Sequence, residues 1–316
     1  MSYLEVIRNA FARYGFGEII EDPVEIRGDV DLNYIITADT GKYFLKKIIN
    51  TPAISQFEFL GSLYTCLKKK DIPVPIIFKT RTGNYVEESF ILYEYIDGIQ
   101  RRDWSRGEMV SLVTNFAKMH EALRGQEVPD FIKNKDDKYI RGGSIQYCHE
   151  VFRSKILELQ CSAEIKDSII KSLDMLWDRF PEIESLPKYI IHGDLNEMNA
   201  LFKDNKNIGI VDFGLSYDPF VYDLGVFCYW FAYPWTSSEI NIDRLGIIVD
   251  TYESVIPLSN LGRELLPYMM LRRSIMDIML ALQWYWNGDP TVHLPEITLE
   301  RKIKHNNKIV EYINSI

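Results

Sequence analysis

Residues 191–199 read Ile-His-Gly-Asp-Leu-Asn-Glu-Met-Asn, and residues 209–214 read Gly-Ile-Val-Asp-Phe-Gly. These stretches contain, in order, the side chains that phosphoryl transfer requires: a carboxylate to receive a hydroxyl proton, then an amide oxygen and a second carboxylate to hold magnesium. Asp194 is the expected base, and Asn199 and Asp212 are the expected magnesium ligands. The alternative is a turn built from Gly, Asp and Asn, which explains any one of these residues better than it explains the set.

Three further features near the motifs have structural interpretations. Residues 208–211 (Ile-Gly-Ile-Val) predict a buried strand that delivers Asp212 to its end, where a carboxylate can bind Mg²⁺. His192 is expected to hydrogen-bond backbone near that carboxylate rather than to act as a second base. Asp223 stands just ahead of an apolar helix and is a candidate for its N-cap.

The chain on either side of the motifs predicts an α+β protein in two parts. Residues 1–97 are expected to hold strands, a short amphipathic helix and one further helix, and residues 98–316 are expected to be mainly helical. The predicted strands cover residues 24–28, 33–37, 43–49, 76–78 and 89–95. The predicted helices cover residues 3–15, 53–70, 106–124, 144–160, 163–180, 223–232, 240–255 and 262–286.

Composition narrows the class of protein. With 316 residues, of which 47% are hydrophobic and 26% charged, the chain can form two lobes and has the balance of a soluble globular protein. A net charge of −9 argues against nucleic acid as a partner, because phosphate backbones are bound by surplus Lys and Arg. The most apolar segment, residues 265–286, contains Arg272, Arg273 and Asp277, so we expect no membrane anchor. The first residues lack the order of a signal peptide, and cysteines without C-x-x-C spacing predict reduced thiols, so we expect a cytoplasmic protein.

The chain resembles the aminoglycoside phosphotransferase and choline kinase superfamily, small-molecule kinases that share the protein-kinase fold. The resemblance rests on the loop 192–199, with His-Gly-Asp in place of His-Arg-Asp, on 212–214, on 218–225, and on Ile-Pro-Val-Pro at 72–75. Type II homoserine kinases and related amino-alcohol kinases are the most similar members. The resemblance implies a small antiparallel-sheet N-lobe with one helix, a larger, mainly helical C-lobe, and ATP bound between them.

The resemblance also implies which residues hold the nucleotide, ATP or alternatively GTP. Lys46 matches the family's phosphate-binding lysine, but Lys47 lies on the opposite face of the same strand and periodicity does not choose between them. Glu58 would be the ion-pair partner of this lysine, and Gly28 would allow the backbone to approach the phosphates. A solvated Glu58 and an ordinary hairpin glycine are the alternatives. The adenine-binding hinge would comprise Tyr93, Glu94, Tyr95 and Ile96.

The acceptor is expected to be a small hydroxylated metabolite: an amino alcohol such as homoserine or choline, or an aminoglycoside. Aromatic side chains would surround an ammonium group, and Arg272 and Arg273 would bind a carboxylate. Alternatively, the aromatic side chains pack in the core, and the arginines face solvent or pair with nearby acids. The substrate candidates are Trp230, Tyr233, Arg272 and Asp277. In the superfamily, the residue matching Asp223 helps to brace the catalytic loop.

Two other classes of protein fit the motifs less well. A protein kinase needs an activation segment after Asp-Phe-Gly, but Asp-Leu-Gly at 223–225 follows almost at once. A catalytically silent protein of the same fold would be expected to have lost the base or a metal ligand, and neither is missing. The sequence therefore predicts a Mg²⁺-dependent small-molecule kinase, and it leaves the oligomeric state open.

Overall fold

The computed structural model describes residues 3–26, 31–49, 54–133, 144–159, 161–234, 237, 239–286 and 295–316. The chain divides into two compact units. The first contains residues 1–108 and 200–211, and the second contains residues 109–199 and 212–316. The boundary predicted at residue 97 therefore falls inside the first unit, which also takes in a hairpin from the middle of the sequence.

The first unit is built on an antiparallel sheet with the strand order β1-β2-β3-β6-β4, in which β5 also pairs with β6. Its strands are β1 (Val24–Ile26), β2 (Leu32–Ala38), β3 (Gly41–Lys47), β4 (Ile77–Phe78), β5 (Val86–Glu87) and β6 (Phe90–Glu94). Strands β2 and β3 form a tight hairpin in which Ala38 is opposite Gly41. The turn Asp39-Thr40 joins them.

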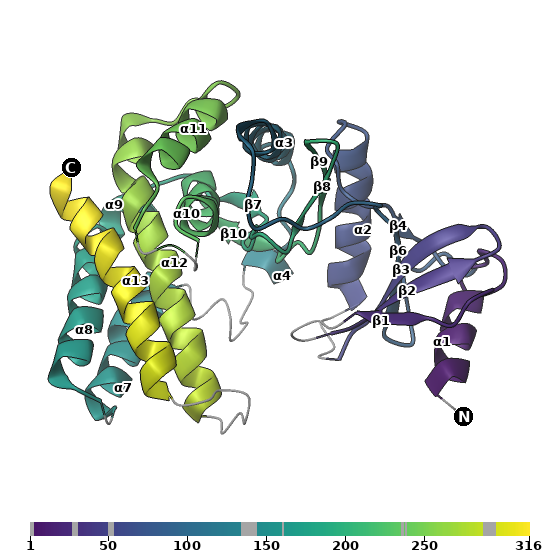
Figure 1. Ribbon diagram of the computed structural model, residues 1–316, viewed down its shortest axis with the longest axis horizontal. Coiled ribbons are helices and arrows are strands. Elements are labelled where there is room, and N and C mark those ends of the chain that lie inside the picture. Colours follow the sequence, from purple (N-terminus) through teal and green to yellow (C-terminus); the bar gives the residue numbers. More distant parts are fainter. Residues whose placement is uncertain are drawn as a thin grey trace. The chain divides into compact units, whose positions relative to one another are not determined.

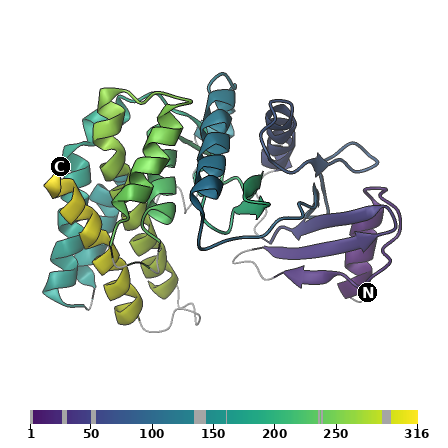
Figure 2. The same cartoon turned by 45° about the horizontal axis from the view of Figure 1, so that its top comes forward.

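Helices α1 (Tyr3–Ala12) and α2 (Ile54–Lys68) belong to this unit. Figure 2 shows α1 lying along one face of the sheet. Ile7 and Phe11 of α1 are buried there against Tyr43 and Leu45, which are alternate residues of β3. The strand period of two therefore turns Lys47 toward α1 and Lys46 toward the opposite face of the sheet.

The hairpin of β8 (Ala200–Lys203) and β9 (Lys206–Ile210) joins the first unit through backbone hydrogen bonds. Ile99 and Phe202 exchange two such bonds of 2.9 Å, and the Ile210 N–H donates to the Pro73 carbonyl at 2.7 Å. Strand β9 was predicted at residues 208–211, whereas β8 was not predicted.

In its described residues, the second unit is helical apart from one short two-stranded ribbon, β7 (Tyr189–Ile191) with β10 (Ser216–Asp218). Its longer helices are α3 (Arg106–Leu123), α8 (Ala163–Asp178), α10 (Phe220–Phe231), α11 (Ile242–Glu253), α12 (Asn260–Trp286) and α13 (Pro295–Ser315). Its shorter helical segments are α4 (Asp130–Lys133), α6 (Ile145–Tyr147), the π-helix η1 (Cys148–Phe152), α7 (Arg153–Glu158) and α9 (Phe180–Glu184).

Helix α10 is the centre of this unit, since nearly all of its side chains are buried. It packs against α12, which in turn packs along α13, and Figure 1 shows α12 and α13 side by side. A Cβ added at Gly225 of α10 would lie 2.4 Å from the Cβ of Met269 on α12. Only glycine fits at this close approach of the two helices. The glycine of the Asp-Leu-Gly sequence is therefore explained by helix packing.

Several sequence predictions are corrected by the structure. The helix predicted at 223–232 begins at Phe220 with Pro219 as its N-cap, so Asp223 lies inside the helix and is not its cap. The single helix predicted at 144–160 consists of α6, η1 and α7 in succession. Helix α13 was not predicted.

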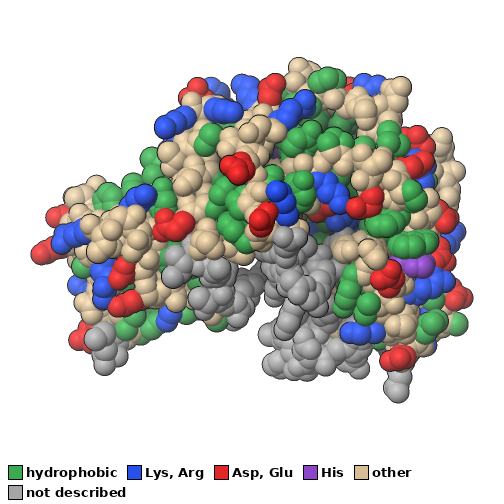
Figure 3. All heavy atoms as spheres, turned by 180° about the vertical axis from the view of Figure 1, so that it is seen from behind, with side chains coloured by type: hydrophobic (Ala, Val, Ile, Leu, Met, Phe, Trp, Pro, Cys, Tyr) green, Lys and Arg blue, Asp and Glu red, His purple; other side chains and the backbone are tan. Residues whose placement is uncertain are grey.

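The four cysteines lie in the described part of the chain, and none of them forms a disulfide. Within the described part of the chain, no helix is both long and apolar enough to cross a membrane. On the face drawn in Figure 3, acidic and basic side chains are interspersed.

Candidate active site

The two motif loops are held side by side by short strand pairs. Residues 192–199 join β7 to β8, and residues 211–215 join β9 to β10. Because β7 pairs with β10 and β8 pairs with β9, both ends of one loop are fastened next to the ends of the other. The Gly214 N–H also donates to the His192 carbonyl at 2.9 Å.

Asp223 fixes the start of the first loop. Its fully buried carboxylate accepts hydrogen bonds from the His192 N–H at 2.8 Å, the Gly193 N–H at 2.9 Å and Nε2 of His120 at 2.9 Å. Gly193 has φ +79°, a left-handed conformation that favours glycine. These contacts correspond to the bracing role that the resemblance implies for Asp223, and His120 is a member of this network that the sequence did not indicate.

His192 is also fully buried, and its ring Nδ1 accepts the Asp194 N–H at 3.3 Å. Its ring lies 4.5 Å from that of Phe213. Its contacts with backbone and with the Asp-Phe-Gly motif are of the kind expected for a structural residue.

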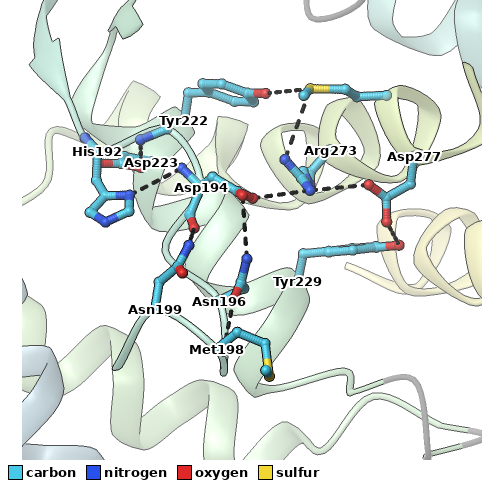
Figure 4. A network of polar contacts seen from close by, with 12 residues as sticks. His192, Asp194, Asn196, Met198, Asn199, Tyr222, Asp223, Tyr229, Arg273 and Asp277 are labelled. Carbon is cyan, nitrogen blue, oxygen red and sulfur yellow. Dashed lines mark hydrogen bonds and ion pairs between the residues drawn. The ribbon is translucent and has the colours of Figure 1, made fainter. Parts of the chain in front are cut away.

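Asp194 is held by contacts on both carboxylate oxygens, as Figure 4 shows. Oδ2 accepts a 3.3 Å hydrogen bond from Asn196, and Oδ1 lies 3.2 Å from Nη2 of Arg273. The side chain is still 44% exposed, so a substrate can reach it. Burial of part of the group raises the pKa of Asp194, and the Arg273 guanidinium opposes that rise.

Asn199 and Asp212 occupy neighbouring positions at the open end of the β8–β9 hairpin. Ala200 is opposite Ile210, so Asn199 and Asp212 leave the two strands at the same end. The side-chain amide of Asn199 donates through Nδ2 to the Asp194 carbonyl at 2.8 Å, which leaves Oδ1 as the atom that can face a cation. Asp212 has φ +61°, an uncommon conformation for a residue other than glycine.

This donor set fits magnesium. One amide oxygen and one carboxylate are oxygen ligands, and Mg²⁺ is commonly held by one or two protein groups together with water and substrate phosphates. Among the described residues, no group of three or more His, Cys, Asp and Glu side chains forms a metal cluster.

The two adjacent arginines of α12 have different partners. Arg272 is buried, with Nη1 2.8 Å from Asp218 and its guanidinium 3.8 Å from the centre of the Tyr222 ring. Arg273 is also buried, but it contacts Asp194 and, through the same Nη2 atom at 3.1 Å, Asp277. Of the two, Arg273 is the residue beside the predicted base, although the substrate candidates included Arg272.

The other substrate candidates also differ in whether they lie near Arg273. Asp277 is buried beside Arg273, accepts the Tyr229 hydroxyl at 3.1 Å and lies 3.9 Å from Lys302. Trp230 has its ring 5.2 Å from the Arg273 guanidinium. Tyr233 instead stacks on His305 at 3.5 Å and is buried in the helical core, as the packing alternative predicted.

The structure separates the two lysines of β3. The amine of Lys47 lies 5.6 Å from the ring centres of both Tyr3 and Phe90, on the face covered by α1. Lys46, on the opposite face, lies 3.6 Å from Asp31, and its side chain is only 15% exposed. Lys46 is therefore the one of the pair whose amine is not engaged under α1.

The remaining nucleotide candidates have structural contacts. Glu58 accepts the backbone N–H of Tyr85 at 2.8 Å, and its predicted ion pair with Lys46 stays a prediction. The Glu94 carboxylate binds Lys68 and the Ile76 N–H, each at 3.0 Å. The ring of Tyr93 packs against Phe44. Tyr95 and Ile96 follow β6 and are half-buried, and Gly28 lies outside the described residues.

Fold and loops together define a kinase-like phosphotransferase, with an antiparallel-sheet unit, a helical unit and an Asp-centred loop. A family profile described as "Phosphotransferase enzyme family" matches residues 23–253. The chain belongs to this family, and it is a kinase with a hydroxyl acceptor, which confirms the class predicted from the motifs.

Individual proteins support the same placement. The homoserine kinase of Parvibaculum lavamentivorans is 24% identical over 88% of this chain and 84% of its own length. The homoserine kinase of Rhodospirillum rubrum is 24% identical over 82% of this chain and 78% of its own length. Among solved structures, amicoumacin kinase hAmiN in complex with AMP-PNP, Ca²⁺ and Ami has a TM-score of 0.71 at 16% identity, covering 98% of this chain and 94% of its own. A microcompartment-associated aminopropanol kinase has a TM-score of 0.70 at 15% identity, covering 98% of both chains.

Proposed function

We propose that this kinase transfers the γ-phosphoryl group of ATP to the hydroxyl of a small amino alcohol or hydroxy amino acid, with homoserine as the first candidate. The observation that carries the proposal is the half-exposed Asp194 carboxylate, held in a loop whose backbone is fixed by Asp223. The named homoserine kinases, which align with most of the chain, support the choice of acceptor.

In the proposed reaction, Asp194 accepts the proton of the acceptor hydroxyl. The hydroxyl oxygen forms a bond to the γ-phosphorus while the bond from that phosphorus to the β–γ bridging oxygen breaks, and ADP leaves with the bond's electron pair. Asp194 then releases its proton to solvent. Asn196 and Arg273 hold the two oxygens of the carboxylate in place, so most of the catalytic effect is positioning.

Asn199 and Asp212 would hold magnesium, which supplies charge neutralisation for the phosphate oxygens. The Asn199 amide is oriented for this role by its hydrogen bond to the Asp194 carbonyl. Both loops reach their positions through paired strands, so base and metal ligands depend on the same local structure. The AMP-PNP and Ca²⁺ bound to amicoumacin kinase support a nucleotide with a divalent cation.

Lys46 would contact the nucleotide phosphates, because Lys47 is engaged by the aromatic rings under α1. The hinge segment 93–96 would bind the base through backbone groups. Its side chains give no choice between ATP and GTP.

Transfer of phosphate from Mg-ATP to homoserine, choline and an aminoglycoside tests the function directly. We expect homoserine to be phosphorylated, and Asp194→Asn to lower kcat by about 10²–10⁴-fold, because the amide keeps the shape but cannot take the proton. Comparison of Mg-ATP with Mg-GTP would identify the donor. Equal turnover by the wild type and Asp194→Asn would contradict the assigned base, and no transfer to any acceptor would support a catalytically silent protein.

A further inference from the structure

We infer that Arg273 determines acceptor specificity by binding a carboxylate of the acceptor, so that the site selects small hydroxy acids over amino alcohols that lack a carboxylate. The inference deepens the proposed function and rests on it for the identity of Asp194 as the residue that faces the hydroxyl. It assigns to Arg273 a role distinct from that of its neighbour Arg272.

The first observation is the position of the Arg273 guanidinium. Nη2 lies 3.2 Å from Oδ1 of Asp194 and 3.1 Å from Oδ1 of Asp277, and Figure 4 shows the group between the two carboxylates. The Arg273 side chain is only 6% exposed. A guanidinium has five N–H donors in a planar fork that matches a carboxylate.

The second observation is a donor without an acceptor. Nε of Arg273 is buried and makes no hydrogen bond with any described residue. Leaving a buried donor unsatisfied costs free energy, and such groups in native proteins call for an explanation, such as a ligand. A carboxylate of the bound substrate, placed beside the guanidinium, supplies the missing acceptor for Nε.

The charges beside the base are balanced. Arg273 and Lys302 carry formal charges of +1 each, and Asp194 and Asp277 carry −1 each, which gives a sum of 0. Burial lowers the pKa of Lys302, and the nearby Asp277 carboxylate opposes that fall. An acceptor carrying only an ammonium would place a second cation beside Arg273, whereas a carboxylate would be attracted to it.

The distances also limit the size of the acceptor. Because Arg273 and Asp194 are in contact at 3.2 Å, a hydroxyl bound to one and a carboxylate bound to the other lie at most roughly 9 Å apart, the sum of that contact and two hydrogen bonds. Homoserine meets this limit, since only three carbon atoms separate its hydroxyl oxygen from its carboxylate carbon. Aminoglycosides carry no carboxylate and do not satisfy the requirement.

Arg272 provides a matched control on the same helix. It is buried like Arg273, but Asp218 and the Tyr222 ring are its contacts. Replacement of either arginine by lysine retains the charge, so the paired carboxylate is not left alone, but removes the planar fork. Arg273→Lys therefore removes the guanidinium beside Asp194, whereas Arg272→Lys removes the guanidinium beside Asp218.

The test compares the binding of three acceptors to protein saturated with Mg-AMP-PNP, by calorimetry. The acceptors are homoserine, 4-hydroxybutanoate, which lacks the ammonium, and 3-aminopropan-1-ol, which lacks the carboxylate. We expect both acids to bind at least about tenfold more tightly than the amine. Arg273→Lys should weaken homoserine binding at least about tenfold, whereas Arg272→Lys should retain the preference for acids.

Each outcome decides a separate question. Equal affinity of the wild type for homoserine and 3-aminopropan-1-ol overturns the inference without any variant, as does undiminished homoserine binding by folded Arg273→Lys. A lack of binding by all three acceptors overturns it as well. Arg273-dependent binding of the acids without phosphate transfer from Mg-ATP supports the inference and rejects the proposed reaction.

Discussion

Asp223 holds the start of the loop that contains the proposed base Asp194, and His120 is its only side-chain hydrogen-bond partner among the described residues. Burial lowers the pKa of His120, so the ring is neutral. Its Nε2 donates to Asp223 and its Nδ1 accepts from the Tyr252 hydroxyl at 2.8 Å. His120 therefore acts as a positioning residue for a loop that it does not touch.

Two substitutions at His120 test this role. In His120→Gln the side-chain amide nitrogen can replace Nε2, whereas in His120→Asn it is too short to reach Asp223. We expect His120→Asn to lower kcat about 10–100-fold more than His120→Gln, with a smaller effect on KM, because small displacements of a catalytic group are costly. Steady-state kinetics with urea unfolding as control separates rate from stability. Equal kcat in the two folded variants would contradict the positioning role.

At the level of helices, replacement by alanine can be compared at Gly225, which is tightly packed, and at Gly246, which has open space beside it. An added Cβ at Gly225 of α10 would lie 2.4 Å from Met269 Cβ and 2.9 Å from its backbone carbon, whereas at Gly246 of α11 it would meet nothing within 4 Å. We expect Gly225→Ala to destabilise by about 1–3 kcal/mol through overpacking, and Gly246→Ala to stabilise by about 0.5–1 kcal/mol. Urea denaturation measures both. A stabilising Gly225→Ala would show that α10 and α12 can separate at little cost.

Helices were predictable where apolar spacing is strong, and less so where buried polar residues interrupt it. The predicted range 163–180 is close to α8, whose N-cap Ser162 accepts the Ile165 N–H. Helix α13 also has buried apolar residues at helical spacing, among them Leu299 and Ile303, but the buried His305 and Asn306 lie on the same helix and obscure the pattern. Burial of such groups depends on partners distant in sequence, such as the Tyr233 carbonyl.

For the whole molecule, the motifs indicated the family, but spacing alone did not reveal which side chains meet across the fold. Asp194, Asn199 and Asp212 could be predicted as site residues because their order in the sequence is itself the signal. Arg273 reaches Asp194 only because α12 returns past the loop, and a sequence pattern cannot distinguish it from Arg272. The i, i+4 spacing of Arg273 and Asp277 was the one local sign of their ion pair.

The buried histidines make the stability of the whole molecule depend on pH. Burial lowers the pKa of His305 to about 4, against 6.5 for the exposed group, although its hydrogen bond to Tyr233 opposes this. Between those values the unfolded chain binds more protons than the folded chain, so stability falls as the pH decreases below about 6.5. For His305 alone the loss is about 2 kcal/mol at pH 5, and it is complete below pH 4. His120 shifts in the same direction.

The variant His305→Gln isolates this contribution, since glutamine can still donate to the Tyr233 carbonyl but does not titrate in this range. We expect the wild type to lose about 2 kcal/mol more unfolding free energy than His305→Gln between pH 7 and pH 5, measured by urea denaturation at each pH. Above pH 7 the two proteins should keep a constant difference, because the ring is neutral in both the folded and the unfolded state. The same loss in both proteins on acidification would show that His305 is protonated equally easily in the folded state, and that other groups cause the acid sensitivity.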